Sequence, residues 1–380
     1  MDFALSDEQR HLRDSVREFA AAEIAPHVLE WDEHETFPSN VIAQLGRLGY
    51  LGCIFPEAHG GADLDYLSYC LVVEELARVD PSVALIVAAH TSLCANHIAL
   101  TATEAQKEKY LAPLASGQAL GCWALTEPGS GSDAAAARTT AVRGGDSWTI
   151  EGTKSFCTNA HYAQLAVVLC VTDRAAQPHG MSAFVVKTDT PGFKLGRKEN
   201  KLGMRASATS EISFTGCQVP DDQRLGQEGE AFIDTLRLLD GGRISIAALS
   251  VGLAQGAYEA ALRYAKQRHQ FGQAIAEFQA IQHKLADMAT SLDAARLLTY
   301  RAAVAYQRGE RVTTMASMAK LFASETATKI AGEAVQVLGG YGFIKDYGVE
   351  KFYRDVKLCT IGEGTSEIQR MVIARGLVKG

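Results

Sequence analysis

The chain has 380 residues, 47% of them hydrophobic, so it is long enough for two or three domains with sizeable cores and does not have the composition of a disordered protein. The formal net charge is -7 and the lysines and arginines are spread along the chain, which argues against nucleic-acid binding because that requires a concentrated basic face. We expect no membrane span, since we find no apolar stretch of the required length, and the start of the chain, MDFALSDEQR, has the features of neither a signal peptide nor a transit peptide. The expected location is the bacterial cytoplasm, or the mitochondrial matrix for a processed eukaryotic form.

The first part of the chain, residues 1–118, has helical periodicity. Ser6 followed by Gln9 has the form of a capping box, in which each side chain accepts the backbone N–H of the other residue at a helix start. Thr103 and Gln106 repeat this pattern before a helix that is expected to end near Gly117. These features predict an N-terminal helical domain.

Residues 119–227 change to short strand-like runs separated by turns. The turns include Gly144–Asp146 and Thr190–Gly192, where glycine and proline interrupt the apolar pattern. The segments expected to be strands are Thr149–Phe156, Gln164–Val171, Met181–Lys187 and Thr209–Phe214. They predict a middle domain that is a β-barrel or a β-sandwich.

From residue 228 to residue 380 the periodicity is helical again. Three long helices are expected at roughly 230–266, 277–308 and 313–338, and a shorter helix closes the chain. Apolar residues on one face of the second helix recur at the 3.6-residue period, namely Ile281, Leu285, Met288, Leu292 and Ala295. Long helices joined by short loops form bundles, so we predict a C-terminal four-helix-bundle-like domain and an α+β multidomain fold.

Cysteines and histidines give no sign of a metal site or a disulfide framework. The eight cysteines include no C-x-x-C pair, and we expect them to be reduced and mostly buried. The histidines do not form H-E-x-x-H or a comparable spacing, so we expect no metal.

The segment Leu125–Asp133 is rich in glycine and serine. Its run from Gly129 to Ala134 matches a relaxed dinucleotide-binding fingerprint, but no strand precedes it and no substantial helix follows, so we reject that interpretation. Its backbone N–H groups and hydroxyls suit an anion or the edge of a heterocycle. An ordinary structural turn remains the alternative.

Two further segments carry side chains suited to a flat, phosphate-bearing ligand. Phe156 lies two residues before Thr158, so on a strand the two share a face and could hold a conjugated ring, although an ordinary half-buried strand fits the same pattern. Arg268, between two expected helices, could bind a phosphate through its planar guanidinium. Charge compensation at a helix C-terminus is the competing explanation.

Near the C-terminus, Glu363 stands between Gly362 and Gly364 and just before a helix-like segment. Glycines allow the backbone to approach a ligand closely, so the carboxylate could point into a pocket. A general base must come within hydrogen-bond reach of the proton it removes, which such a position permits. The alternative is a carboxylate that interacts with the N-terminal dipole of the helix.

Taken together, the motifs resemble those of one enzyme family. In chain order they are LTEPGSGSD, TKSFCTN, LDGGR, RHQFG, QVLGGYGF and IGEGTSEIQR. This order resembles the acyl-CoA dehydrogenase family of flavoproteins over essentially the whole chain. The segments DGGRISIA (240–247) and GTSEIQR (364–370) make it most similar to the short-chain (butyryl-CoA) and short branched-chain members.

The resemblance implies FAD as cofactor and an acyl-CoA as substrate. The implied reaction is α,β-dehydrogenation to the trans-2-enoyl-CoA, in which Glu363 removes the α-proton and the β-hydrogen leaves as hydride to flavin N5. Electrons would pass to electron-transfer flavoprotein, in fatty acid β-oxidation or branched-chain amino acid catabolism. An acyl-CoA oxidase that uses O2, and a catalytically silent scaffold homologue, are the alternatives.

The resemblance also implies binding residues and a homotetramer, a dimer of dimers, whose subunits share each cofactor. The flavin would be held by Trp123, Leu125, Thr126, Gly131, Ser132, Phe156 and Thr158, together with Gly364, Thr365 and Glu367. A neighbouring subunit would hold the pyrophosphate and adenosine through Arg268, Phe271, Gln279, Gln336, Gly339 and Gly340. The substrate would contact Ser132, Asp240, Arg243, Gly362 and Gly364.

Three positions differ between branches of the family. Trp often stands where this chain has Phe156, which bears on flavin exposure. Tyr commonly precedes the catalytic Glu, whereas here the residue is Gly362, so we expect a wider acyl pocket that accepts branched or longer groups. In the isovaleryl-CoA dehydrogenase branch the base lies on the first long C-terminal helix, and the matching residue here is Gly242, which cannot serve.

Overall fold

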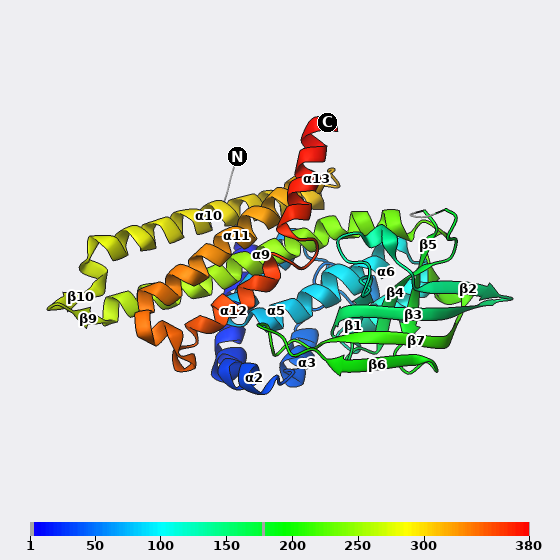
Figure 1. Cartoon of the computed structure of the whole chain (residues 1–380), viewed down its shortest axis with the longest axis horizontal. Helices are drawn as coiled ribbons and strands as arrows, with labels where there is room; N and C mark the ends of the chain where they lie inside the picture. Colours follow the sequence, from blue (N-terminus) through cyan, green and yellow to red (C-terminus); the bar gives the residue numbers. More distant parts are fainter. Residues whose placement is uncertain (1–3, 177–178, 380) are drawn as a thin grey trace.

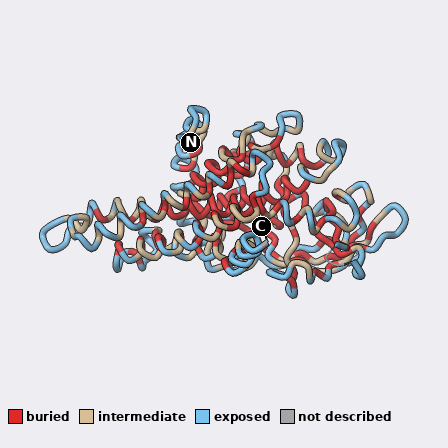
Figure 2. The backbone as a smooth tube through the Cα atoms, turned by 90° about the horizontal axis from the view of Figure 1, so that it is seen from above, coloured by how far each residue is buried: buried red, intermediate tan, exposed pale blue. Residues whose placement is uncertain are grey.

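A computed structural model describes residues 4–176 and 179–379. The molecule is elongated (Figure 1), with the large sheet at one end and the far tips of two long helices, α9 (Ala231–Gln267) and α10 (Gln279–Gln307), at the other. A buried core runs through its middle, and the tips are exposed (Figure 2). The predicted order of a helical, a β and a second helical domain is confirmed.

The N-terminal region is helical, as predicted. Its helices are α1 (Asp7–Phe19), α2 (Val28–His34), α3 (Ser39–Arg47), α4 (Tyr66–Val79), α5 (Pro81–Ala88), α6 (Asn96–Thr101), α7 (Glu104–Gln106) and α8 (Ala112–Ala115). Both predicted capping boxes are present, at Ser6 and at Thr103, and each satisfies two N–H groups that a helix start would otherwise leave unpaired.

The middle region forms one continuous sheet. Its strands are β1 (Gly121–Ala124), β2 (Thr140–Gly144), β3 (Ser147–Thr158), β4 (Leu165–Val171), β5 (Met181–Lys187), β6 (Phe193–Lys198), β7 (Thr209–Pro220) and β8 (Arg224–Leu225). The order is β6-β7-β3-β2-β4-β5-β8, and β1 pairs with β4 in parallel. The four strands predicted from the sequence correspond to β3, β4, β5 and β7, whereas β1, β2, β6 and β8 were missed.

The sheet folds over a core of its own. Trp148 on β3 and Phe184 on β5 are not on neighbouring strands, yet their ring centroids lie 5.4 Å apart. One face of β4 lines this core, and its other face packs against the N-terminal helices, so all seven residues of β4 are buried. The curvature accounts for the barrel-like or sandwich-like character predicted from the sequence.

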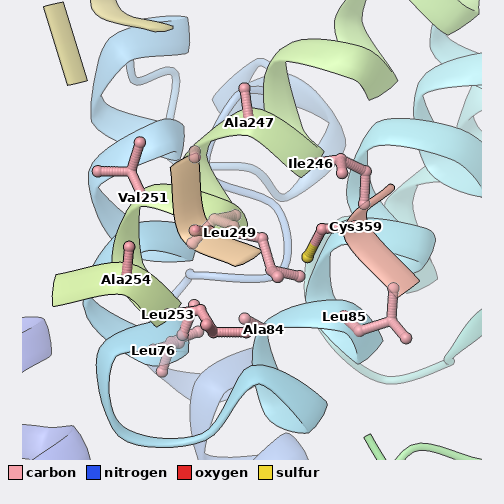
Figure 3. Close-up of a cluster of buried hydrophobic side chains, with 14 of the residues drawn as sticks. Leu76, Ala84, Leu85, Ile246, Ala247, Leu249, Val251, Leu253, Ala254 and Cys359 are labelled. Atoms are coloured by element: carbon pink, nitrogen blue, oxygen red, sulfur yellow. The ribbon is translucent and has the colours of Figure 1, made fainter. Parts of the chain in front are cut away.

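The C-terminal region contains α9, α10, α11 (Thr313–Leu338), α12 (Val349–Cys359) and α13 (Ser366–Lys379), close to the predicted ranges. A two-stranded hairpin of β9 (His269–Gln270) and β10 (Gln273–Ala274) joins α9 to α10. The N-terminal and C-terminal helices share one core: Leu76 of α4, Leu85 of α5, Leu249 of α9 and Cys359 of α12 meet in it (Figure 3). All eight cysteines are buried and free.

The expectation that no apolar stretch is long enough to cross a membrane was wrong in one place. The continuous helical segment Pro81–Thr101 has 21 residues and a mean hydropathy of 1.6. The fold itself buries 83% of its apolar window, as in the core helix of a globular protein. Polar residues interrupt the pattern, but tertiary packing buries them too; His90 and His97 are examples.

A buried lysine joins the three regions. Lys351 on α12 donates to Asp80, which caps α5, at 2.8 Å, and to Asp355, also on α12, at 2.5 Å. Asp355 in turn accepts the backbone N–H of Met204, which follows the sheet strand β6. Two buried carboxylates therefore depend on one cation for their charge compensation.

We expect Lys351→Ala to lower the free energy of unfolding by about 3–5 kcal/mol, because it leaves both carboxylates buried without a cation. The measurement is the shift in thermal unfolding midpoint relative to the unsubstituted protein. Lys345→Ala is the matched control, since Lys345 and its partner Glu33 are both exposed, and exposed pairs contribute about 0–1 kcal/mol. Equal midpoints for the two variants would contradict a role for Lys351 at the domain junction.

Candidate active site

Glu363 lies in the loop between α12 and α13, in a left-handed conformation with φ of +53°. Gly364 follows with φ of +94°, which favours glycine. Two side chains hold the carbonyl groups of the loop by hydrogen bonds. Gln369 Nε2 donates to the oxygens of Glu363 and Gly364 at 3.2 and 3.0 Å, and Lys320 Nζ donates to the Gly364 oxygen at 2.8 Å. A non-glycine residue in this conformation needs such support, and strained residues are common at functional sites.

The side chain of Glu363 reaches helix α9 at Gly242. A Cβ atom added to Gly242 would overlap Oε2 of Glu363, so only glycine leaves room for the carboxylate there. Glu363 as a residue is half-buried, but its Oε2 atom is sealed from solvent and has no hydrogen-bond partner among the described residues. A buried carboxylate oxygen without a partner is free to accept a proton from a ligand.

The electrostatics of Glu363 suit a general base. Burial raises the pKa of Glu363 to about 7, and the Lys320 and Arg243 cations oppose that rise. A base with a pKa near the working pH is the most effective. The alternative role at a helix N-terminus does not fit the geometry, because α13 begins at Ser366 and the acid in its first turn is Glu367.

Beside the carboxylate, α9 carries a buried ion pair. Arg243 donates to Asp240 at 2.9 Å, and Thr313 of α11 donates to the other Asp240 oxygen at 2.6 Å. Burial raises the pKa of Asp240 and lowers that of Arg243. The Nε–H of Arg243 has no partner among the described residues, which leaves one donor available in the site.

The loop that follows β1, residues 125–133, is fixed by the buried side chain of Glu127 and has open space beside its glycines. Glu127 accepts the backbone N–H groups of Arg138 and Thr139 and the ammonium of Lys154 at 2.6, 2.9 and 2.7 Å. A Cβ atom at Gly129 or Gly131 would meet no atom within 4 Å. Thr126 and Leu125 are half-buried, and Ser132 is exposed. The loop therefore presents exposed backbone from a rigid base.

Two aromatic side chains flank this loop. Trp123 on β1 donates its indole N–H to His97 Nδ1 at 3.1 Å, and burial lowers the pKa of His97 to about 4, so the imidazole is neutral at pH 7. Phe156 lies at a register irregularity of β3 with φ of +57°, and 67% of its surface is exposed. Cys157 is buried, so Phe156 and Thr158 lie on the open side of the strand. An exposed ring next to open backbone leaves room for a planar group such as a flavin.

The second predicted set of cofactor residues lies at the opposite end of the molecule. Arg268 caps α9, and its guanidinium stacks on the Tyr341 ring at 5.3 Å, which argues against simple helix charge compensation. Arg268 and Gly340 line a surface cavity of about 510 Å³, next to exposed Gln336 and Gly339. The hairpin and the start of α10 add two further exposed residues, Phe271 and Gln279.

The two sets of residues are too far apart for one cofactor to reach within one chain. Arg268 follows Gly242 by 26 residues of α9, about 39 Å at the helical rise of 1.5 Å per residue. Figure 1 shows the same separation, with the sheet at one end and β9 and β10 at the other.

Within residues 4–176 and 179–379, no group of three or more His, Cys, Asp or Glu side chains could hold a metal ion.

The chain therefore combines a helical–β–helical fold with a buried, unpartnered carboxylate oxygen and an open loop after β1, and the comparisons give the class of protein that this combination belongs to. Models of the N-terminal, middle and C-terminal domains of acyl-CoA dehydrogenase match residues 6–118, 122–217 and 232–378. The chain belongs to the acyl-CoA dehydrogenase family, and FAD is its cofactor.

Similar proteins span the whole chain. A probable acyl-CoA dehydrogenase, YngJ, of Bacillus subtilis is 48% identical over 100% of both chains, and the short-chain specific acyl-CoA dehydrogenase of Clostridium acetobutylicum is 45% identical over 98% of this chain and 99% of its own length. Butyryl-CoA dehydrogenase from Megasphaera elsdenii has a TM-score of 0.98 with 43% identity and full coverage of both chains.

Two further solved structures bear on electron transfer and on the cofactor. A structure described as the electron transferring flavoprotein of Acidaminococcus fermentans contains a chain with a TM-score of 0.99, 44% identity and full coverage of both chains. A glutaryl-CoA dehydrogenase from Mycobacterium smegmatis in complex with FADH2 has a TM-score of 0.94 and 32% identity, covering 99% of this chain and 96% of its own.

Several residues of the site were missed from the sequence. Lys320 is a lysine in the buried stripe of α11, among Ala316, Ala323 and Ala327, and that exception to the apolar pattern was a usable signal. Lys154 breaks the buried face of β3 in the same way. His97 gave no such signal, because its contact with Trp123 joins residues from separate elements.

We expect Gly242→Ala to displace the Glu363 carboxylate and to lower kcat for acyl-CoA oxidation by about 100-fold, since a misplacement of about 1 Å at a reacting group has that effect. Flavin content and thermal stability, measured in parallel, separate this loss from misfolding. Gly144→Ala is the control, because an added Cβ there meets nothing within 4 Å. Wild-type kcat in Gly242→Ala would show that the carboxylate does not act from this position.

Proposed function

We propose that this protein oxidises a short-chain acyl-CoA to the trans-2-enoyl-CoA, with Glu363 as the base that removes the α-proton. The observation that carries the proposal is the Glu363 carboxylate, whose Oε2 is sealed and unpartnered against Gly242 and whose pKa burial raises to about 7. The short-chain specific relative and the butyryl-CoA dehydrogenase structure support a short acyl group.

A thioester α-proton is only weakly acidic, so its carbonyl must be polarised while the base acts. The backbone N–H of Glu363 makes no hydrogen bond to any described residue and is available as a donor. Left-handed φ at Glu363 and Gly364 turns the peptide groups around the base, and Gln369 and Lys320 fix that orientation. FAD, when bound, supplies the acceptor for the electrons and the β-hydrogen.

For the cofactor we propose the contacts that the family resemblance implies, and the two open surfaces support them. One subunit would hold the flavin with Trp123, Leu125, Thr126, Gly131, Ser132, Phe156, Thr158, Gly364, Thr365 and Glu367. A second subunit would hold the pyrophosphate and adenosine with Arg268, Phe271, Gln279, Gln336, Gly339 and Gly340. The separation of these sets along α9 supports a shared cofactor and hence an oligomer, for which we propose a homotetramer.

The CoA thioester would enter beside α9. Asp240 and Arg243 form a buried pair there, and the unpaired Nε–H of Arg243 is free to contact it. Ser132, Gly362 and Gly364 would complete the substrate contacts.

We place the domain boundaries at 1–118, 119–227 and 228–380. The bacterial relatives support a cytoplasmic location.

Electron-transfer flavoprotein is the proposed acceptor, supported by the similarity to a chain in the Acidaminococcus fermentans structure. An oxidase that reduces O2 directly is the second candidate, because the chain is also similar to a solved structure named as a prolyl acyl carrier protein oxidase, with a TM-score of 0.95 and 32% identity. Oxygen consumption with butyryl-CoA and no other acceptor decides between them. Rapid consumption would identify an oxidase, and consumption far slower than the rate with electron-transfer flavoprotein would identify a dehydrogenase.

The pH dependence tests the role of Glu363. The base acts only when ionised, so kcat should rise as the pH rises through about 7 and level off above it. The measurement is kcat for butyryl-CoA between about pH 5.5 and 9, in the range where stability is unchanged. Glu325→Gln, at an exposed carboxylate, should keep this profile. A rate that falls as the pH rises through this range would rule out an ionised base of this kind.

The absence of a side chain at Gly362 predicts a wider acyl pocket. The φ of Gly362 is not in the left-handed region, and a Cβ there would make ordinary contacts with Leu358 at 3.5–3.6 Å, so the site accepts a larger residue. We expect Gly362→Tyr to raise the ratio of kcat/KM for butyryl-CoA over isobutyryl-CoA by roughly tenfold, the effect of about one methyl group in a pocket. Gly362→Ala should change the ratio little. An unchanged ratio in Gly362→Tyr would show that this position does not shape the pocket.

A further inference from the structure

Lys320 is a fully buried lysine in the middle of α11. Its side chain lies in the stripe that packs against α9 and α12, where the buried positions one turn away are the small residues Ala316, Ser317, Ala323 and Ser324. Burying an ammonium group is costly unless other groups compensate its charge. No carboxylate of the described residues lies within 4.0 Å of Nζ, so the cation is not placed there by a simple ion pair.

The contact that Lys320 makes is with the loop that carries Glu363. Nζ donates to the carbonyl oxygen of Gly364 at 2.8 Å, and Gln369 donates to the same oxygen at 3.0 Å. These two donors come from α11 and α13 and fix the peptide group that links Gly364 to Thr365, and Gln369 also donates at 3.2 Å to the Glu363 oxygen, which belongs to the peptide group directly after Glu363. Together these contacts hold Glu363 in its left-handed conformation, with φ of +53°, from which the carboxylate reaches Gly242.

The charged and titratable groups that act on Lys320 come from α9, α12, the Glu363 loop and α13. They are Arg243 on α9, Cys359 on α12, Glu363 in the loop and Glu367 on α13, while Tyr66 on α4 and Arg243 face Glu363. Among the buried groups, the two cations Lys320 and Arg243 balance the two anions Asp240 and Glu363. Without Lys320 the ionised form of Glu363 would carry an unbalanced negative charge, which favours the protonated form.

Burial lowers the pKa of Lys320 to about 8, against the opposing effects of Cys359 and Glu363, so the ammonium is still charged at pH 7. Arg243 is already paired with Asp240 at 2.9 Å. Of the two cations near Glu363, Arg243 therefore forms an ion pair with Asp240, whereas Lys320 forms no ion pair with another carboxylate.

We propose that Lys320 is a positioning residue for Glu363: its ammonium group orients the loop through the Gly364 carbonyl and supplies the positive charge that keeps the buried carboxylate ionised. This proposal rests on the proposed role of Glu363 as the base. A lysine with a purely structural role would stabilise the loop without affecting the ionisation of Glu363, and the two roles differ in their pH dependence.

The test compares Lys320→Gln, Lys320→Met and Lys320→Arg in the flavin-loaded enzyme. Glutamine keeps a donor without the charge, methionine removes both, and arginine keeps the charge. In Lys320→Gln and Lys320→Met we expect the acid limb of the kcat profile to move upward by about one pH unit, with kcat at pH 7 about fivefold lower. Lys320→Arg should keep the wild-type limb. Lys329→Met, at an exposed lysine of the same helix, is the matched control and should match the wild type.

A second readout does not depend on activity. The protonation of Glu363 is followed against pH by infrared difference spectroscopy without substrate, with Glu363→Gln identifying the carboxyl band. The midpoint should rise in Lys320→Gln and Lys320→Met and stay in place in Lys320→Arg. An unchanged midpoint and an unchanged acid limb would overturn the proposal, even if thermal stability falls. A shifted midpoint in a protein that does not oxidise acyl-CoA would support the role of Lys320 while rejecting the proposed function.

Discussion

The close approach of Glu363 to α9 is the constraint on which the site depends. The first long C-terminal helix has no side chain at Gly242, and the carboxylate from the end of the chain occupies that space. Two left-handed residues, Glu363 and Gly364, are needed to turn the loop inward, and donors from α11 and α13 hold it there. The same position seals Oε2 from solvent, which raises the pKa of Glu363 to about 7. The contact between the Glu363 carboxylate and Gly242 thus links the backbone conformation of the loop, its packing against α9 and the raised pKa of Glu363.

The fold supports this contact by joining distant parts of the sequence. Helices α4 and α5 share a core with α9 and α12, so α9, the helix that carries Gly242, packs against residues of both helical regions (Figure 3). Lys351 connects that core to the sheet region through Asp80 and Asp355. The sheet contributes an anchored loop and an exposed Phe156, whereas the matching surface around Arg268 lies at the far tip of α9. The proposal that two subunits share a cofactor rests on this separation.

The sequence predicted the long helices within a few residues because their periodicity extends over many turns, and it predicted β5 at its observed bounds, Met181–Lys187. It missed the sheet strands β1, β2, β6 and β8, which are only two to six residues long. The order of motifs predicted the family and singled out Glu363. Three features could not be predicted, because each arises from packing between elements far apart in the chain. They are the close approach of the Glu363 carboxylate to Gly242, the left-handed conformation of Phe156 and the hydrogen bond from Lys320 to Gly364.

The most direct test is anaerobic mixing of the FAD-loaded protein with butyryl-CoA, in the wild type and in Glu363→Gln, while the visible spectrum is recorded. The account predicts that the flavin band bleaches in the wild type and stays oxidised on the same time scale in the variant, with a rate about 10²–10⁴-fold lower and an equal flavin content. Bleaching of the variant at the wild-type rate would contradict the role of Glu363 as the base. A wild-type flavin that stays oxidised would contradict butyryl-CoA as a substrate.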